Sequence, residues 1–349
     1  MHNLDLHQRL LRCKTAYTTR HIDLSEAADL NTTTTPRAGD LVLAEVRKIG
    51  HHKALELRDG RRASLFVGDE IVVAYGHRYA PDQFEAEIRG DLEPCDLVAA
   101  GGLASNVLSR SEKTGVATRI APIGLLTNRQ GKVFNVADAA LPPLRAAKSA
   151  RVYAVIGSSM NAGKTTTAVS LIRGFIAAGY RVGSAKVTGT GAGGDVWRMM
   201  DAGARPALDF TSAGVVSTYK VDRDQLLRIF STLTSHAMNS GIDVLVLEVA
   251  DGLYQQETAA LLQSREFQDL VDGVFFAARD ALGAKAGVDW LTRQRLRVVA
   301  LSGIITIAPL AIQEATEAVG LPVLGCNELM DPVTLEELTS TELARVVNQ

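Results

Sequence analysis

The spacing of apolar residues divides the chain into two regions of different character. Between residues 39 and 88, short runs alternate apolar and polar side chains, which is the pattern of half-buried strands. We expect five of them, at 41–46, 53–57, 61–65, 69–74 and 83–88. Short strands at this spacing, bounded by turn signals such as Asp59-Gly60, predict a small antiparallel barrel or sandwich.

From residue 151 the pattern changes to buried strands that alternate with amphipathic helices. The expected strands are 152–156, 181–187, 206–210, 243–248, 271–278, 297–303 and 321–325; the expected helices are 163–178, 224–239, 284–294 and 309–319, with a further helical segment opening at Asp195. Alternation of this kind builds a three-layer domain around a mostly parallel sheet. The predicted fold class is therefore α/β, preceded by a smaller β-rich, barrel-like domain.

These changes of pattern also set the expected domain boundaries. At 349 residues the chain is longer than one typical domain. We assign 1–38 to an N-terminal segment with a short helix around Leu4–Leu11, 39–140 to the β-rich domain, 141–150 to a linker and 151–349 to the α/β domain. Within the β-rich domain, an apolar run at 96–100 and a strand-like stretch at 117–126 are interpreted as a unit separate from the five strands. Gly101-Gly102 between them either lets backbone approach a ligand or simply makes a turn, and both readings stay open.

The strongest chemical signal lies where the first strand of the second region ends. Gly157 is followed by Ser158, Ser159, Met160, Asn161, Ala162, Gly163, Lys164, Thr165 and Thr166, and an amphipathic helix begins there. A glycine-bearing loop between a strand and a helix binds phosphate with its backbone N–H groups and the helix N-terminus. Lys164 would then reach the β- and γ-phosphates, and the Thr165 hydroxyl would hold Mg²⁺. The first glycine of the usual G-x-x-x-x-G-K-[ST] motif falls on Ser158, one residue after Gly157.

A second cluster follows the next strand. Lys186 lies at its carboxyl end, and the glycine-rich run 188–194 leads into Asp195. Ligands bind outside the carboxyl ends of strands in open α/β sheets. Lys186 is therefore a candidate catalytic residue, and Thr188 and Asp195 are candidate substrate residues, although Asp195 would also serve as a helix N-cap.

A third cluster ends the apolar strand 243–248. The acid at the end of the strand beside a phosphate loop commonly orders Mg²⁺. Glu248 holds that position and is a candidate catalytic and metal-binding residue, with Asp251 three residues later as its rival.

Residues 151–325 resemble P-loop NTPases of the SIMIBI class, and within it the branch of dethiobiotin synthetase, cobyric acid synthase and MobB-like proteins. The resemblance rests on GSSMNAGKTTTA at 157–168, AKVTGTG at 185–191 and VLVLEVADG at 244–252. It implies that Lys164 and Thr165 bind phosphate and Mg²⁺, that Glu248 lies near metal and substrate, and that Lys186 contacts phosphate or an acidic substrate. ParA and MinD relatives carry an extra lysine where this chain has Ser158, which argues against partitioning ATPases. The NKxD guanine motif is absent near 301–306, so ATP is the expected nucleotide.

Composition narrows the setting and the partners. A net charge of −2, with 22% charged residues, gives no bulk attraction to nucleic acid or to an anionic membrane. The three cysteines are far apart, the first residues are too charged for a signal peptide, and no apolar run reaches the roughly 18 residues of a membrane span. We expect a cytoplasmic homo-oligomer, a dimer, that takes a small-molecule acceptor and binds neither membrane nor nucleic acid.

Together these features predict an Mg²⁺-dependent, ATP-binding enzyme of ligase or kinase-like type. It would transfer a phosphoryl group from ATP to activate a small-molecule acceptor, which by the resemblance is a carboxylate. The alternative is a regulatory ATPase switch that binds a protein or nucleic-acid partner through its N-terminal β domain.

Overall fold

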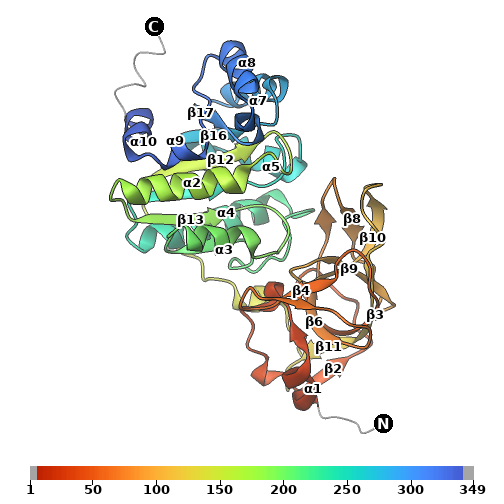
Figure 1. The fold of residues 1–349 in the computed structure, drawn as a ribbon. Coiled ribbons are helices and arrows are strands. Elements are labelled where there is room, and N and C mark those ends of the chain that lie inside the picture. The colour runs from red at the N-terminus through yellow and green to blue at the C-terminus, as the bar shows by residue number, and fades with distance from the viewer. Residues whose placement is uncertain (1–5, 341–349) are drawn as a thin grey trace. The chain divides into compact units, whose positions relative to one another are not determined.

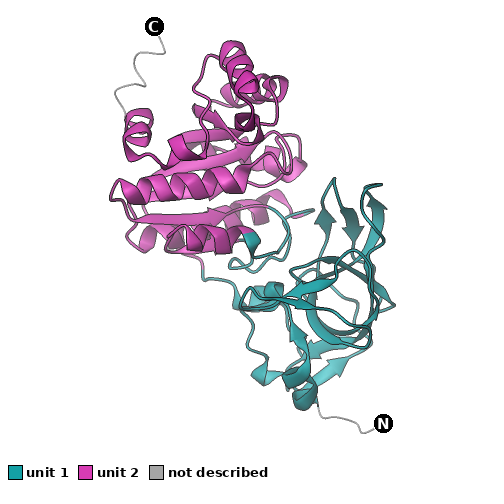
Figure 2. Ribbon diagram, viewed as in Figure 1, with its two compact units in different colours: residues 1–142, 189–194, 210–220 teal, residues 143–188, 195–209, 221–349 magenta. Residues whose placement is uncertain are grey.

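The computed structural model describes residues 6–340, so Leu4 of the first predicted helix and the last residues of the α/β domain, 341–349, lie outside it (Figure 1). The chain divides into two compact units (Figure 2). The first contains residues 1–142, 189–194 and 210–220, and the second contains 143–188, 195–209 and 221–349. Two short segments from the middle of the α/β sequence thus belong with the β-rich part.

The first unit is built mainly from strands. It contains α1 (Leu6–Arg12), the 3-10 turns η1 (Tyr17–Thr19), η2 (Leu24–Glu26) and η3 (Val136–Ala139), and the strands β1 (Lys14–Thr15), β2 (Asp29–Asn31), β3 (Leu41–Lys48), β4 (Ala54–Glu56), β5 (Arg62–Ser64), β6 (Glu70–Tyr75), β7 (Arg78–Tyr79), β8 (Phe84–Glu87), β9 (Cys95–Ala99), β10 (Leu103–Arg110) and β11 (Thr118–Thr127).

Pairing in this unit closes a ring of strands. β6 pairs with β3, β3 with β11, β11 with β9 and β9 with β10, and β10 returns to β6 in a parallel pairing. Successive residues of β3 point to opposite faces and pack into two hydrophobic clusters. Val42 and Ala44 belong to one cluster, and Leu41 and Leu43 belong to the other. The predicted barrel-like domain is confirmed.

The membership of the ring differs from the prediction. All five predicted strands form, but β4 and β5 make a separate hairpin, and β8 pairs outside the ring with β7 and β10. The stretches 96–100 and 117–126, expected to form a separate unit, supply β9 and most of β11 of the ring itself. Alternation of apolar residues identifies a strand, but only long-range pairing decides which strands close a barrel.

The second unit is a parallel sheet covered by helices. It contains the strands β12 (Arg151–Gly157), β13 (Val182–Lys186), β14 (Ala207–Asp209), β15 (Val244–Glu248), β16 (Gly273–Ala277) and β17 (Val298–Ser302), the helices α2 (Lys164–Ala177), α3 (Gly194–Asp201), α4 (Arg223–Asn239), α5 (Gln256–Leu262), α6 (Arg265–Leu270), α7 (Ala281–Arg293), α8 (Pro309–Val319), α9 (Cys326–Met330) and α10 (Pro332–Thr339), and the turn η4 (Ile304–Ile307).

The sheet order is β14-β13-β15-β12-β16-β17, and every pairing is parallel. The predicted α/β class is confirmed. The chain moves from β12 to β13 in one direction and from β14 to β15 in the other, so right-handed connections place α2 and α4 on opposite faces. Phe175 of α2 stacks on Tyr153 of β12 with ring centroids 5.3 Å apart, which anchors α2 to the sheet.

The strand predicted at 321–325 is wrong. In this stretch only Val323 forms a bridge, which is parallel and pairs it with Leu301. A longer parallel ladder needs a backbone N–H donor at every second residue, and Pro322 has none. No helix formed by residues 6–340 is long and apolar enough to cross a membrane.

Candidate phosphate-binding site

The loop between β12 and α2 is attached to neighbouring strand ends at two points. The Ser158 N–H donates to the carbonyl oxygen of Ala277 at 2.9 Å, and the Ala162 carbonyl accepts from the Ile304 N–H at 3.0 Å. Gly163, directly before α2, has φ of +102°, which is a conformation that only glycine adopts readily. The chain therefore has the strand–loop–helix geometry that a phosphate-binding loop requires.

The position of the first glycine has a direct structural reason. A Cβ on Gly157 would lie 2.8 Å from Lys164 Cγ, because the lysine side chain runs across this residue. The Lys164 ammonium then donates to the Ser159 carbonyl at 2.8 Å, within the loop. The close approach that requires glycine falls on residue 157, so residue 158 can carry a side chain.

The Thr165 hydroxyl lies between two acids. It is 2.9 Å from Asp195 Oδ1 and 3.2 Å from Glu248 Oε1, and it can donate its single proton to one of them at a time. Asp195 also forms an ion pair with the buried Lys186 ammonium. Lys186 and Glu248 are register partners on β13 and β15, and Glu248 is opposite Val155 on β12. Three adjacent strand ends therefore bring Lys164, Thr165, Lys186, Asp195 and Glu248 together.

Asp195 does not occupy the N-cap position that sequence reasoning kept open. Helix α3 begins at Gly194, and the Asp195 side chain is directed to Thr165 and Lys186. Its carboxylate is thus part of the cluster at the phosphate loop.

Burial and charge shift the pKa values within the cluster. Burial raises the pKa of Glu248 to about 7, with the charge of Asp195 adding to the effect. Burial lowers the pKa of Lys164 although nearby Glu248 opposes it. At Lys186 burial acts in the same direction but is outweighed by Asp195 and Glu248, so its pKa is raised. Both buried lysines thus lie close to acids of opposite charge, of which Glu248 is itself buried.

The residues present fit a magnesium ion that arrives with a nucleotide. Glu248 Oε2 is buried and has no hydrogen-bond partner among residues 6–340, so an acceptor oxygen is available beside the Thr165 hydroxyl. Mg²⁺ at such sites takes one or two carboxylates together with substrate phosphates and waters. Within this described part of the chain, no three His, Cys, Asp or Glu side chains gather into a cluster that could hold a metal.

Asp251 and Thr188 lie beside the cluster. Asp251 has φ of +65° in the turn after β15. Its charge opposes the lowering of the Lys164 pKa and adds to the raising of the Lys186 pKa. The buried Thr188 hydroxyl accepts from the Ala250 N–H at 2.8 Å and so joins the ends of β13 and β15. The structure gives Thr188 this bridging contact, while its predicted role toward a substrate remains a prediction.

Sequence reasoning missed one cation at this site. Arg198 on α3 donates to the Thr166 hydroxyl at 3.2 Å, next to the first turn of α2. The sequence could have identified Arg198 by its spacing from Asp195, because residues three apart on a helix lie on the same face.

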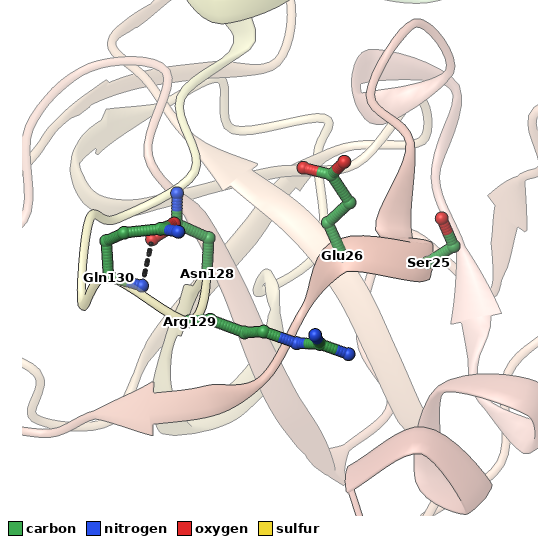
Figure 3. Close-up of a pocket in the computed structure, with 5 residues that line it drawn as sticks. All are labelled: Ser25, Glu26, Asn128, Arg129 and Gln130. Carbon is green, nitrogen blue, oxygen red and sulfur yellow. Dashed lines mark hydrogen bonds between the residues drawn. The ribbon is translucent and has the colours of Figure 1, made fainter.

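A separate cavity of about 350 Å³ lies in the first unit, between the turn η2 and the turn after β11 (Figure 3). It is lined by Ser25, Glu26, Asn128, Arg129 and Gln130. These side chains are polar and mostly exposed, and none of them is a predicted site residue.

No protein-family model matches the chain, and no curated protein matches it. Among solved structures, the signal recognition particle receptor FtsY from Elizabethkingia anophelis is 18% identical over 52% of this chain and 59% of its own, with a TM-score of 0.35. The signal recognition particle 54 kDa protein from Aeropyrum pernix K1, in complex with GDP, is 16% identical over 58% and 49%, with a TM-score of 0.36. The cell division protein ftsY from Thermotoga maritima is 18% identical over 59% and 74%, with a TM-score of 0.37.

The chain thus spans 59% and 49% of the length of the first two of these proteins. Likeness at these identities and TM-scores carries no conclusion about what this chain binds or does.

Proposed function

We propose that this chain is an Mg²⁺-dependent P-loop NTPase of the SIMIBI class that transfers the γ-phosphoryl group of a nucleoside triphosphate. One observation carries the proposal: the phosphate loop, two buried lysines and two acids converge at the ends of β12, β15 and β13. Positioning and charge neutralisation do most of the catalytic work in phosphoryl transfer, and this cluster supplies both.

The residues divide between the nucleotide and the reacting group. When the nucleotide binds, the Lys164 ammonium would leave the Ser159 carbonyl and donate to phosphate oxygens. The backbone N–H groups of the loop would bind the other phosphate oxygens. Thr165 and Glu248 would hold Mg²⁺, which would neutralise the charge of the phosphates. Lys186 holds Asp195 in place and presents positive charge to the γ-phosphate or to an acidic acceptor. With a carboxylate acceptor, one of its oxygens would attack the γ-phosphorus, so that a new P–O bond forms as the bond to the bridging oxygen breaks and the nucleoside diphosphate leaves; no proton needs to be transferred.

The finer assignments follow from the resemblance and are part of the proposal. ATP is the proposed nucleotide, because the guanine motif is absent from the segment that contains Gly303 and Ile304. A carboxylate is the proposed acceptor, as in the dethiobiotin synthetase branch, and the enzyme would then act as a ligase or kinase.

The central test measures nucleotide affinity and phosphate release with ATP and GTP side by side, with and without Mg²⁺. Replacing Lys164 by Ala removes an ammonium whose interaction with the phosphate oxygens strengthens in the transition state. Turnover should therefore fall roughly 10²–10³-fold while the protein stays folded. Lys285→Ala is the matched control, because Lys285 is an exposed lysine of the same unit, paired with Asp289. Full activity of Lys164→Ala would refute the mechanism. Tighter binding and faster turnover of GTP than of ATP would make GTP the nucleotide of this protein.

A regulatory switch is the second candidate. It is favoured by one observation, which is that the segment 189–194 between Lys186 and Asp195 belongs to the β-rich unit. Slow hydrolysis with nucleotide-dependent capture of a protein or nucleic acid would support the switch, whereas turnover stimulated by a small carboxylate would support the enzyme.

A homodimer is also proposed. Several large apolar side chains of the second unit are exposed, among them Tyr254 (82%), Leu282 (81%) and Leu310 (80%). Light scattering coupled to size-exclusion chromatography, with and without nucleotide, tests it. A mass of one chain under both conditions would rule it out.

A further inference from the structure

The glycine-rich loop 189–194 belongs to the first, β-rich unit (Figure 2). The Gly193 N–H donates to Oε2 of Glu56 at 3.0 Å, across 137 positions of sequence. Glu56 ends strand β4 and is only 2% exposed. A buried carboxylate bound to a backbone N–H is a strong contact, because the hydrogen bond is charge-assisted and shielded from water.

Close backbone packing holds the same loop from other sides. A Cβ on Gly101 would collide with the Gly191 carbonyl oxygen, and a Cβ on Gly191 would lie 2.8 Å from Thr18 Cγ2. The Gly191 N–H also donates to the Val216 carbonyl at 2.8 Å. Gly101 therefore lets backbone of the chain itself approach, whereas Gly102 has a φ of +96° and lies against the Ala16 side chain. All of these contacts lie within the first unit.

The loop is directly continuous with the phosphate site. The loop begins three residues after Lys186 and ends directly before Asp195. Gly193 is two residues from Asp195, so a fully extended chain could separate them by no more than about 7 Å. A shift of Gly193 must therefore be absorbed by Gly194 or passed to Asp195, whose carboxylate contacts Thr165 and Lys186.

We infer that Glu56 is a positioning residue for phosphoryl transfer: by holding Gly193 it sets the backbone that carries Asp195. This inference rests on the proposed function for its kinetic consequence. The effect passes along the chain itself, from Gly193 through Gly194 to Asp195. The competing interpretation is that Glu56 only stabilises the β-rich unit.

The test compares Glu56→Ala, Glu56→Gln and the matched control Glu45→Ala in the full chain. Glu45 is a half-buried glutamate of β3 whose carboxylate pairs with the exposed Arg47 at 3.0 Å. Glu56→Ala should lower kcat about tenfold or more and leave the nucleotide Kd within about twofold, because the phosphate loop has its own attachments. Glu56→Gln keeps an acceptor oxygen for the Gly193 N–H and should restore at least half of kcat, and Glu45→Ala should match the wild type.

Amide hydrogen exchange supplies a readout that does not depend on turnover. In the nucleotide-free protein, Glu56→Ala should speed exchange in peptides covering 189–194 at least tenfold and leave peptides covering 157–164 unchanged. Unchanged exchange at 189–194 overturns the inference, whether or not the protein hydrolyses nucleotide. Faster exchange in a chain that neither binds nor hydrolyses nucleotide overturns the proposed function and retains the attachment of the loop.

A purely structural role gives a different pattern. It lowers the melting temperature and the fraction of active protein in Glu56→Ala, with kcat per active site and loop exchange unchanged, and this result overturns the inference. If Glu56→Ala does not fold, Glu56→Gln and Gly101→Ala carry the test: the first must keep loop exchange within about twofold of the wild type, and the second must raise it.

Discussion

The two glycine-rich loops at the phosphate site differ in where their attachments come from. The phosphate loop 157–164 is held by Ala277 and Ile304, residues of the unit that contains it. The loop 189–194 is held by Glu56, Gly101 and Thr18, from strands and turns near the start of the chain. One loop is thus held by residues of the second unit, and the other is held by residues of the first unit.

This difference teaches that a glycine-rich sequence has no single meaning. In the phosphate loop, glycine makes room for the Lys164 side chain and allows the turn into α2. In the loop 189–194, glycine makes room for another stretch of backbone. Because the attachments of the two loops are different, a substitution that disturbs one loop should leave the other unchanged.

Neutralising Glu248 should act on the phosphate loop side alone. Glu248→Gln removes the buried carboxylate beside Thr165, and the Mg²⁺ concentration for half-maximal turnover should rise roughly 10–100-fold. Magnesium titrations of phosphate release measure it, with Asp251→Asn as the comparison and amide exchange at 189–194 as the check on the other loop. A larger effect of Asp251→Asn would move the metal-binding role to Asp251.

Adding a methyl group to Gly101 should act on the other loop. Gly101→Ala forces the turn against the Gly191 carbonyl and should destabilise the first unit by about 1–3 kcal/mol, the usual cost of overpacking. Urea unfolding followed by circular dichroism measures the loss. Gly115→Ala is the matched control, because a Cβ there meets no atom within 4 Å. Equal stability of the two variants would show that the contact between Gly101 and Gly191 is not maintained.

Mild acid should loosen the β9–β10 hairpin that carries Gly101. Burial, followed by the charge of Arg78, lowers the pKa of His52 to about 4, with smaller contributions from His51 and Arg62. The His52 ring contacts the Val98 carbonyl of β9 at 2.9 Å.

The direction of this pH dependence follows from the protonation of His52 in the folded and the unfolded chain. The unfolded chain binds a proton on His52 near its ordinary pKa of 6.5, and the folded chain does so only near 4. Stability is therefore complete above pH 6.5 and falls as the pH drops toward 4, by at most about 3 kcal/mol. Unfolding curves between pH 7 and pH 4.5 measure this, and His52→Gln should flatten that part of the dependence. A wild-type stability that is constant over this range would contradict the assignment.

Sequence alone determined the parts whose causes are local. Strand, glycine, lysine, threonine and helix follow one another at 152–177, so the phosphate loop and the start of α2 could be predicted from consecutive residues. Lys186 and Glu248 could be predicted as well, because parallel strands bring their carboxyl ends to one edge of a sheet.

Only the tertiary structure decided the parts that depend on contacts between distant residues. It placed the required glycine at 157 through the path of Lys164, directed Asp195 to Thr165, and closed the barrel with strands expected to lie elsewhere. It also joined Glu56 to Gly193. A buried carboxylate at the end of a short strand has no sequence pattern that names its partner, because the choice among distant backbone N–H groups is made by how the whole unit packs.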